Sequence, residues 1–430
     1  MSAGGAFPPI RTETLSSGLR LVTESMAEVR SVSVGFWVGS GSRDEPARIA
    51  GASHFLEHLL FKGTVTRSAA AIAEALDEVG GDCNAYTTKE YTAFYVRLLS
   101  EHLPLGLDIL SEIMWDPALR ESDLEAERTV ILDEILMHLD EPADLVVEKC
   151  FGALFPDHPL GRDALGTAES VGEISVADVR RFFEAHYRPE NMVISVAGDC
   201  EHDEVARAIE ERFGGRTGGG PPDRRAPGTP VEPLVVLNRP TEQAHLTLGI
   251  RCVSRLDDDR WPYSVLNHVL GGGMSSRLFQ KVREQRGLAY SIGSERLAYQ
   301  DAGSLCVFVG TAPANVDEVL GIIGDELDLL ATGGVTEREL AVAKGNLRAE
   351  ALLACEDSGA RMSRIGAGLL LHGEAKTVDE ILARIDQVDL DDVRRVARRL
   401  MDEPRALAVV GPFDPEAFDA AAVGLAGHLA

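Results

Sequence analysis

A chain of 430 residues, 45% of them hydrophobic, is long enough to form two or three domains with well-packed cores. Its formal net charge of −27 argues against nucleic acid as a partner and is compatible with cationic peptide substrates. No apolar run reaches the roughly 18 residues that a membrane-spanning helix needs, and the N-terminal region resembles neither a signal nor a transit peptide. Six scattered cysteines without a CxxC pair indicate reduced thiols. We therefore expect a cytoplasmic protein that does not bind membranes.

A helix predicted over residues 53–64 carries the most informative motif, His54-Phe55-Leu56-Glu57-His58. Histidines at positions i and i+4 project from one face of a helix and can hold one metal ion. Glu57 lies on nearly the same face, where its carboxylate can serve as general base for a water that the metal activates. The alternative is a buried helix with two hydrogen-bonded core histidines, which the pentapeptide alone does not exclude.

A second helix, predicted over residues 122–137, supplies aligned carboxylates. Ser122 or Asp123 is a suitable N-cap, and Glu127 and Glu134 are seven positions apart on one face. Carboxylates on a buried face need charged partners or a metal, whereas a solvated acidic face needs neither. Because catalytic zinc usually has three protein ligands, this helix is a candidate source of the third.

A segment rich in glycine and proline, residues 214–233, reads as a linker between two halves of the chain. The halves look like diverged copies. An apolar strand at residues 191–199 has a counterpart at 404–412, and a helix beginning at Asp123 has one beginning at Glu339. A repeat of this length indicates duplication of one unit.

Strands predicted at residues 30–37 and 91–99 alternate irregularly with longer amphipathic helices. This pattern predicts an α+β fold of two similar domains, each an antiparallel-rich mixed sheet packed with α-helices. We place an N-terminal metal-binding domain at residues 1–213 and a C-terminal domain at 234–430.

The second half does not repeat the metal motif. At the repeat offset, Leu270 and Met274 stand where the two histidines stand in the first half, so we expect one metal site per chain. A glycine run at residues 271–273 precedes a predicted helix, an arrangement that can bind phosphate. It lacks the Lys-Ser/Thr ending of a P-loop, so a flexible turn is the favoured interpretation.

In these features the chain resembles the M16 (pitrilysin-type, inverzincin) zinc metallopeptidases, and in particular the β subunits of mitochondrial processing peptidase and their bacterial homologues. Glu134 lies 76 residues after His58, and Glu127 lies seven before Glu134, which are the spacings of that family. The resemblance implies that His54, His58 and Glu134 bind one Zn²⁺ per chain. It further implies that Glu57 is the general base and that Glu127 orients a ligand histidine.

The resemblance also implies how a peptide is held. In the family the substrate adds as a strand to a sheet edge near the zinc. The matching residues here are Asn84, Ala85 and Tyr86. Arg283 and Tyr290, seven apart, match a pair that binds the substrate backbone and stabilises the oxyanion; this spacing favours Arg283 over Arg286. An ordinary edge strand, a surface arginine and a half-buried tyrosine are the alternatives.

Together these implications predict a zinc-dependent endopeptidase that hydrolyses peptides or extended, unfolded polypeptide segments, with the C-terminal domain clamping the substrate. Larger family members hold four such domains, so the resemblance implies a homodimer in which Arg283 and Tyr290 of one chain face the zinc of the other. The alternatives are a non-catalytic partner or structural subunit, or a processing-peptidase subunit that requires a distinct α partner. The complete motif argues against the first, and the presence of both residue sets on one chain argues against the second.

Overall fold

The computed structural model describes residues 9–213, 215, 217–228 and 230–418. They form two compact units. The first consists of the described residues up to Ile135, Asp163–Arg224 and Ala351–Ile381, and the second of Leu136–Arg162, Arg225–Glu350 and the described residues from Leu382 onward. Each unit therefore includes one segment from the other half of the chain.

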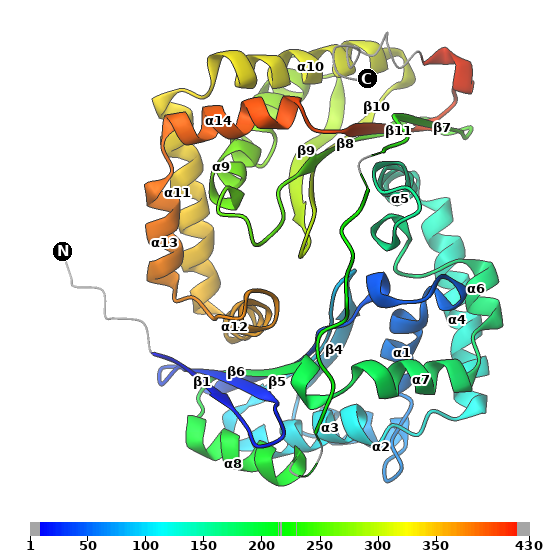
Figure 1. Cartoon of the computed structure of the whole chain (residues 1–430), viewed down its shortest axis with the longest axis vertical. Coiled ribbons are helices and arrows are strands. Elements are labelled where there is room, and N and C mark those ends of the chain that lie inside the picture. The colour runs from blue at the N-terminus through cyan, green and yellow to red at the C-terminus, as the bar shows by residue number, and fades with distance from the viewer. Residues whose placement is uncertain (1–8, 214, 216, 229, 419–430) are drawn as a thin grey trace. The chain divides into compact units, whose positions relative to one another are not determined.

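The first unit is built on a six-stranded mixed sheet (Figure 1). Across the sheet the strands are β1 (Ile10–Thr14), β2 (Arg20–Ser25), β6 (Met192–Gly198), β3 (Ser31–Val38), β5 (Thr92–Leu99) and β4 (Asp82–Thr87). The β2–β6 pair is parallel and the four other neighbouring pairs are antiparallel. Strand β4 is at one edge, and its residues alternate between exposed and partly buried, as a half-covered strand requires.

The helices of the chain, in order, are α1 (Ala52–Leu60), α2 (Ala69–Asp77), α3 (Leu103–Trp115), α4 (Glu121–Asp140), α5 (Pro142–Leu154), α6 (Ala168–Glu173), α7 (Val176–His186), α8 (His202–Phe213), α9 (Arg260–Leu270), α10 (Val316–Gly333), α11 (Glu337–Leu353), α12 (Ser358–His372), α13 (Val378–Gln387) and α14 (Leu390–Met401). None of them is both long and apolar enough to cross a membrane, within the part of the chain that the structure describes. The expected cytoplasmic location stays a prediction.

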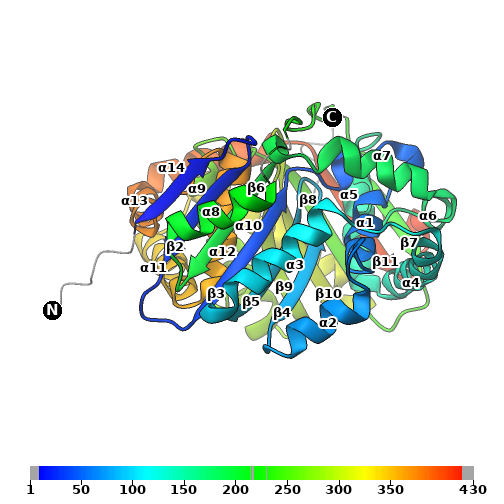
Figure 2. The ribbon, with the colours of Figure 1, turned by 90° about the horizontal axis from the view of Figure 1, so that it is seen from below.

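Helices cover both faces of the first sheet (Figure 2). Successive side chains of a strand point to opposite faces, and β3 shows the result. Phe36 packs against Phe213 of α8, with ring centroids 5.7 Å apart. The next residue, Trp37, lies in a buried cluster with Met362 and Ile365 of α12. Nearly every residue of β3 is consequently buried.

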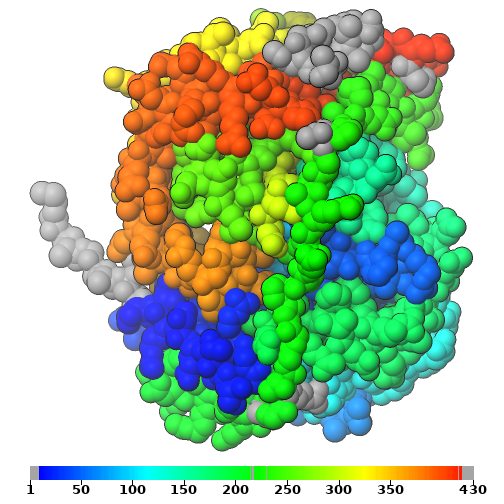
Figure 3. Space-filling model, viewed as in Figure 1, coloured from blue at the N-terminus to red at the C-terminus, as the bar shows by residue number. Residues whose placement is uncertain are grey.

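Helix α12 approaches its sheet very closely because glycine stands at the crossing. A Cβ atom at Gly366 would lie 2.2 Å from Trp37 Nε1, so any side chain there would push the helix away. The helix is also held by Glu24 of β2, whose carboxylate accepts hydrogen bonds from Arg361 and Arg364. In Figure 3 the orange surface of α12 lies against the blue surface of the first strands.

The second unit contains a five-stranded mixed sheet. Across it the strands are β7 (Leu234–Asn238), β11 (Arg405–Gly411), β8 (Ala244–Cys252), β10 (Gly303–Thr311) and β9 (Ala289–Ala298). The β7–β11 pair is parallel and the other three pairs are antiparallel. This order repeats that of β2, β6, β3, β5 and β4. The predicted α+β fold of two similar, antiparallel-rich units is confirmed.

The duplication extends to an exchange of helices. Helix α12, from the second half of the chain, packs on β3 and β6 of the first sheet, and α5, from the first half, packs on β8 and β11 of the second. These strands occupy matching positions in the two sheets. The described part of the predicted linker, residues 215, 217–228 and 230–233, contains no helix or strand.

Candidate metal centre

Helix α1 presents the His-Phe-Leu-Glu-His motif, and its first turn is tightly fixed. The helix begins after Gly51, whose φ of 95° is rarely adopted by residues other than glycine. The carboxylate of Glu45 accepts hydrogen bonds from the backbone N–H groups of Gly51 and Ser53, at 2.7 and 2.6 Å. A carboxylate at this end of a helix stabilises it by satisfying free N–H groups and opposing the helix dipole.

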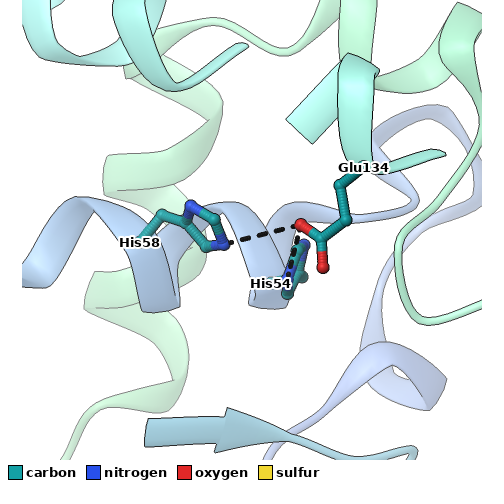
Figure 4. A group of neighbouring side chains, drawn as sticks. All are labelled: His54, His58 and Glu134. Carbon is teal, nitrogen blue, oxygen red and sulfur yellow. Dashed lines mark ion pairs between the residues drawn. The ribbon is translucent and has the colours of Figure 1, made fainter. Parts of the chain in front are cut away.

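Three side chains from α1 and α4 converge on one point (Figure 4). Glu134 Oε2 lies 3.7 Å from His54 Nε2 and 3.8 Å from His58 Nε2. Ligand atoms about 2.1 Å from a tetrahedral zinc ion lie roughly 3.4 Å from one another. Two imidazole nitrogens and one carboxylate oxygen are also the donors that catalytic zinc prefers. The predicted ligand residues therefore lie together, with a donor set and spacing that fit zinc.

His58 is oriented by Glu127, the second glutamate of α4. The distance from His58 Nδ1 to Glu127 Oε2 is 2.9 Å. A carboxylate accepts this bond only from a protonated Nδ1, so the Nε2 lone pair is left toward Glu134. Glu127 is itself held by Lys62, whose Nζ lies 2.6 Å from Oε1. Burial raises the pKa of Glu127, but the hydrogen bonds from Lys62 and His58 outweigh burial and lower it.

His54 is buried and electrically neutral near pH 7. Burial, together with the nearby His58, lowers its pKa to about 4. A metal ligand must be neutral imidazole, so this environment suits a ligand. Unlike His58, His54 has no hydrogen-bond partner for its buried Nδ1 among the residues that the structure describes.

Glu57 is half-buried beside the ligand cluster. Its Oε2 accepts a hydrogen bond of 2.6 Å from Thr87 Oγ1. Burial raises the pKa of Glu57, while the Thr87 hydrogen bond and His58 act in the opposite direction. A carboxylate with a raised pKa is a stronger base and suits proton transfer at neutral pH.

The predicted substrate-binding residues lie on edge strand β4. Asn84, Ala85 and Tyr86 pair with Tyr95, Phe94 and Ala93 of β5, and β4 has no other strand partner among the described residues. The ring of Tyr86 packs edge-on against Trp37. Thr87, at the end of the same strand, points to the opposite face and reaches Glu57. An edge strand suitable for pairing thus leads directly to the candidate base.

Arg283 and Tyr290 belong to the second unit and contact each other. Arg283 lies in a π-helix, Phe279–Glu284, with its guanidinium carbon 5.1 Å from the centroid of the Tyr290 ring and 4.7 Å from that of Phe279. Tyr290, at the start of β9, is 80% exposed. Arg286, by contrast, pairs with Glu318 at 2.9 Å. The structure therefore places Arg283, rather than Arg286, beside the exposed tyrosine.

Sequence reasoning missed two residues of this site, Lys62 and Thr87. Lys62 is four positions after His58, a spacing that in the helix predicted over residues 53–64 would place it on the same face as His58 and could have indicated a partner for a nearby carboxylate. In the structure α1 ends at Leu60, and Lys62 lies in the turn that follows. Thr87 directly follows the three residues that were predicted to bind substrate, but no local signal connects it with Glu57, 30 residues earlier.

Comparisons with known protein families cover most of the chain. A family model described as "Insulinase (Peptidase family M16)" matches residues 20–168, and one described as "Peptidase M16 inactive domain" matches residues 173–347.

Curated relatives from several bacteria carry the name uncharacterized zinc protease. One from Mycobacterium tuberculosis is 44% identical over 414 residues, which cover 95% of this chain and 94% of that protein. One from Streptomyces coelicolor is 43% identical, with 94% and 90% covered. One from Bacillus subtilis is 39% identical, with 94% and 98% covered.

Solved structures share the fold. A peptidase M16 inactive domain from Pseudomonas fluorescens superimposes with a TM-score of 0.88 at 20% identity, covering 94% of this chain and 98% of that one. A protease from Helicobacter pylori gives a TM-score of 0.85 at 22% identity, covering 94% and 100%.

Proposed function

Because this chain belongs to the M16 peptidase family, we propose that it is a zinc-dependent endopeptidase acting on peptides or extended, unfolded polypeptide segments. The observation that carries the proposal is the convergence of His54, His58 and Glu134, with ligand atoms within 4.8 Å of one another, directly beside Glu57. The names of the relatives support zinc and proteolysis. One zinc ion per chain, held by these three residues, is part of the proposal.

Zinc, when bound, polarises the scissile carbonyl and makes water a better nucleophile at neutral pH. Glu57 accepts the proton of the attacking water and then passes it to the nitrogen of the leaving amine. The raised pKa of Glu57 suits both steps, because the carboxylate must take up the proton in the first step and hold it only until the second. Glu127 keeps His58 in the tautomer that leaves Nε2 free, and Lys62 keeps Glu127 ionised.

The peptide backbone pairs with β4 along Asn84, Ala85 and Tyr86 in this proposal. Backbone pairing requires an extended substrate and gives affinity that does not depend on sequence. Arg283 and Tyr290 bind the substrate backbone, and the Tyr290 hydroxyl donates to the oxyanion. Support for that role comes from the exposure of Tyr290 and its contact with Arg283. The catalytic domain is then proposed at residues 1–213 and the clamping domain at residues 234–430, apart from α5 and α12, each of which packs on the sheet of the other half.

The test is a comparison of the wild type with Glu57→Gln on a fluorogenic extended peptide. The amide keeps the size of the side chain but cannot accept the proton, so we expect zinc content to stay near one ion per chain while kcat falls at least about 1,000-fold. A chelator should abolish wild-type activity, and added zinc should restore it. Zinc-independent hydrolysis, or a Glu57→Gln protein with unchanged kcat, would contradict the proposal.

A further inference from the structure

Thr87 makes a side-chain hydrogen bond that links the candidate base to the peptide-binding edge. Its Oγ1 donates to Glu57 Oε2 at 2.6 Å, and among the described residues it is the sole hydrogen-bond donor to that carboxylate. It is also the last residue of β4, directly after Tyr86. We infer that Thr87 is a positioning residue, which holds Glu57 through Oε2 so that Oε1 takes the proton from water. This inference rests on the proposed function.

The reason is the freedom of a glutamate side chain. The terminal torsion of a carboxylate is broad, so Glu57 would otherwise rotate and present either oxygen in several directions. A donor bound to Oε2 restricts that freedom and leaves Oε1, which has no donor among the described residues, as the oxygen better able to accept a proton. When Glu57 is ionised, as a general base must be, this hydrogen bond is stronger than a bond between neutral groups.

Thr87 is well placed to supply a rigid donor. A threonine side chain is branched at Cβ and has few χ1 rotamers in a strand. β4 is paired with β5 through six residue pairs, the last of which is Thr87 with Thr92. The hydroxyl therefore moves with the strand to which the substrate is proposed to bind. A peptide paired with this edge and the oxygen that accepts the proton are held by the same strand, so their distance is kept constant.

The experiment uses zinc-loaded full-length protein and four variants. Thr87→Val removes the donor and keeps the shape, Thr87→Ala removes the donor and reduces the volume, and Thr87→Ser keeps the donor. Thr92→Val is the matched control, since Thr92 lies opposite Thr87 but its Oγ1 donates to the Ser40 carbonyl oxygen at 3.1 Å and not to Glu57.

We expect Thr87→Val and Thr87→Ala to lower kcat about 10- to 100-fold with KM changed less than about threefold, because misplacing a reacting group affects the chemical step more than binding. Thr87→Ser should keep kcat within about threefold of wild type, as should Thr92→Val. Zinc content should be unchanged in all four. Unchanged kcat in Thr87→Val and Thr87→Ala, loss of zinc, or equal losses in Thr87→Val and Thr92→Val would overturn the inference.

A double-mutant cycle tests whether Thr87 acts through Glu57. If it does, adding Thr87→Val to Glu57→Gln will not lower the residual kcat further, whereas independent effects would multiply. Failure of this inference is distinguishable from failure of the proposed function. An active wild type, an inactive Glu57→Gln and a fully active Thr87→Val would defeat only the role of Thr87. Absence of zinc-dependent hydrolysis in the wild type would defeat the proposed function itself.

Discussion

Lys62 changes the electrostatic balance of the metal centre. The centre brings three glutamates, Glu57, Glu127 and Glu134, near two histidines that must stay neutral to bind a metal. Without a cation, Glu127 would be a buried carboxylate with no full charge partner, which is costly. The 2.6 Å contact with Lys62 supplies that partner. Glu127 therefore stays able to accept the hydrogen bond from the protonated Nδ1 of His58.

Zinc affinity should therefore fall in a graded series. We expect His58→Ala to lose most of its zinc, because it removes a ligand atom. Glu127→Gln should weaken zinc binding about 10- to 100-fold, as is typical when the group that orients a ligand histidine is replaced. Lys62→Met should weaken it less, and Lys62→Arg should restore wild-type binding. Competition with a chromophoric chelator measures these constants. Full zinc occupancy in His58→Ala would rule out the ligand assignment.

Spacing in the sequence correctly predicted which residues of one helix share a face. His54 and His58 are one helical turn apart, and Glu127 and Glu134 are two turns apart, so each pair necessarily shares a face. Helical spacing did not predict that α4 approaches α1 and brings Glu134 to the histidines. That expectation came from the family resemblance. The contact between Thr87 and Glu57 depends on how β4 packs against α1, which no repeat in the sequence encodes.

Helix α12 is joined to its sheet through a single buried carboxylate. Glu24 of β2 is only 1% exposed and accepts hydrogen bonds from Arg361 and Arg364 of that helix. Another ion pair joins the same helix to the sheet, between Arg97 of β5 and Asp357, but its side chains are 49% and 45% exposed. The two contacts offer a direct comparison of buried and exposed charge pairs on one helix.

Glu24→Ala should lower the free energy of unfolding by about 3–5 kcal/mol, because it leaves two guanidinium groups without their buried partner. Arg97→Ala should cost no more than about 1 kcal/mol, since water screens an exposed pair. Urea titrations followed by circular dichroism will give both values. Equal losses in the two variants would mean that burial does not determine the strength of these contacts.

The elements themselves were well predicted. Strand β3 was expected at residues 30–37 and lies at Ser31–Val38, and α4 was expected at 122–137 and lies at Glu121–Asp140. Alternation and helical spacing are local properties, so they survive in a single sequence. The exchange of α5 and α12 is not a local property. Both helices have ordinary amphipathic sequences, and nothing in such a pattern specifies which of two similar sheets the apolar face will cover.

For the whole molecule, the proposed homodimer determines how activity responds to mixing of variants. His58→Ala and Tyr290→Phe should each be largely inactive as homodimers, the first through loss of zinc and the second through loss of the oxyanion donor. If Tyr290 of one chain serves the zinc of the other, a mixed dimer has one site with both defects and one with neither. Activity should then return on mixing, measured with the fluorogenic peptide. No recovery, or a fully active purified monomer, would exclude composite sites.

The exchanged helices also impose an order on biosynthesis. The strands β2, β3 and β6 have all been synthesised by Gly198, but α12, which covers one face of their sheet, ends at His372. During translation the apolar face that includes Trp37 and Val193 therefore stays uncovered until α12, in the second half of the chain, has left the ribosome. The nascent chain exposes this apolar surface while residues 199–372 are synthesised, which favours binding by chaperones and increases the risk of aggregation when translation is aborted.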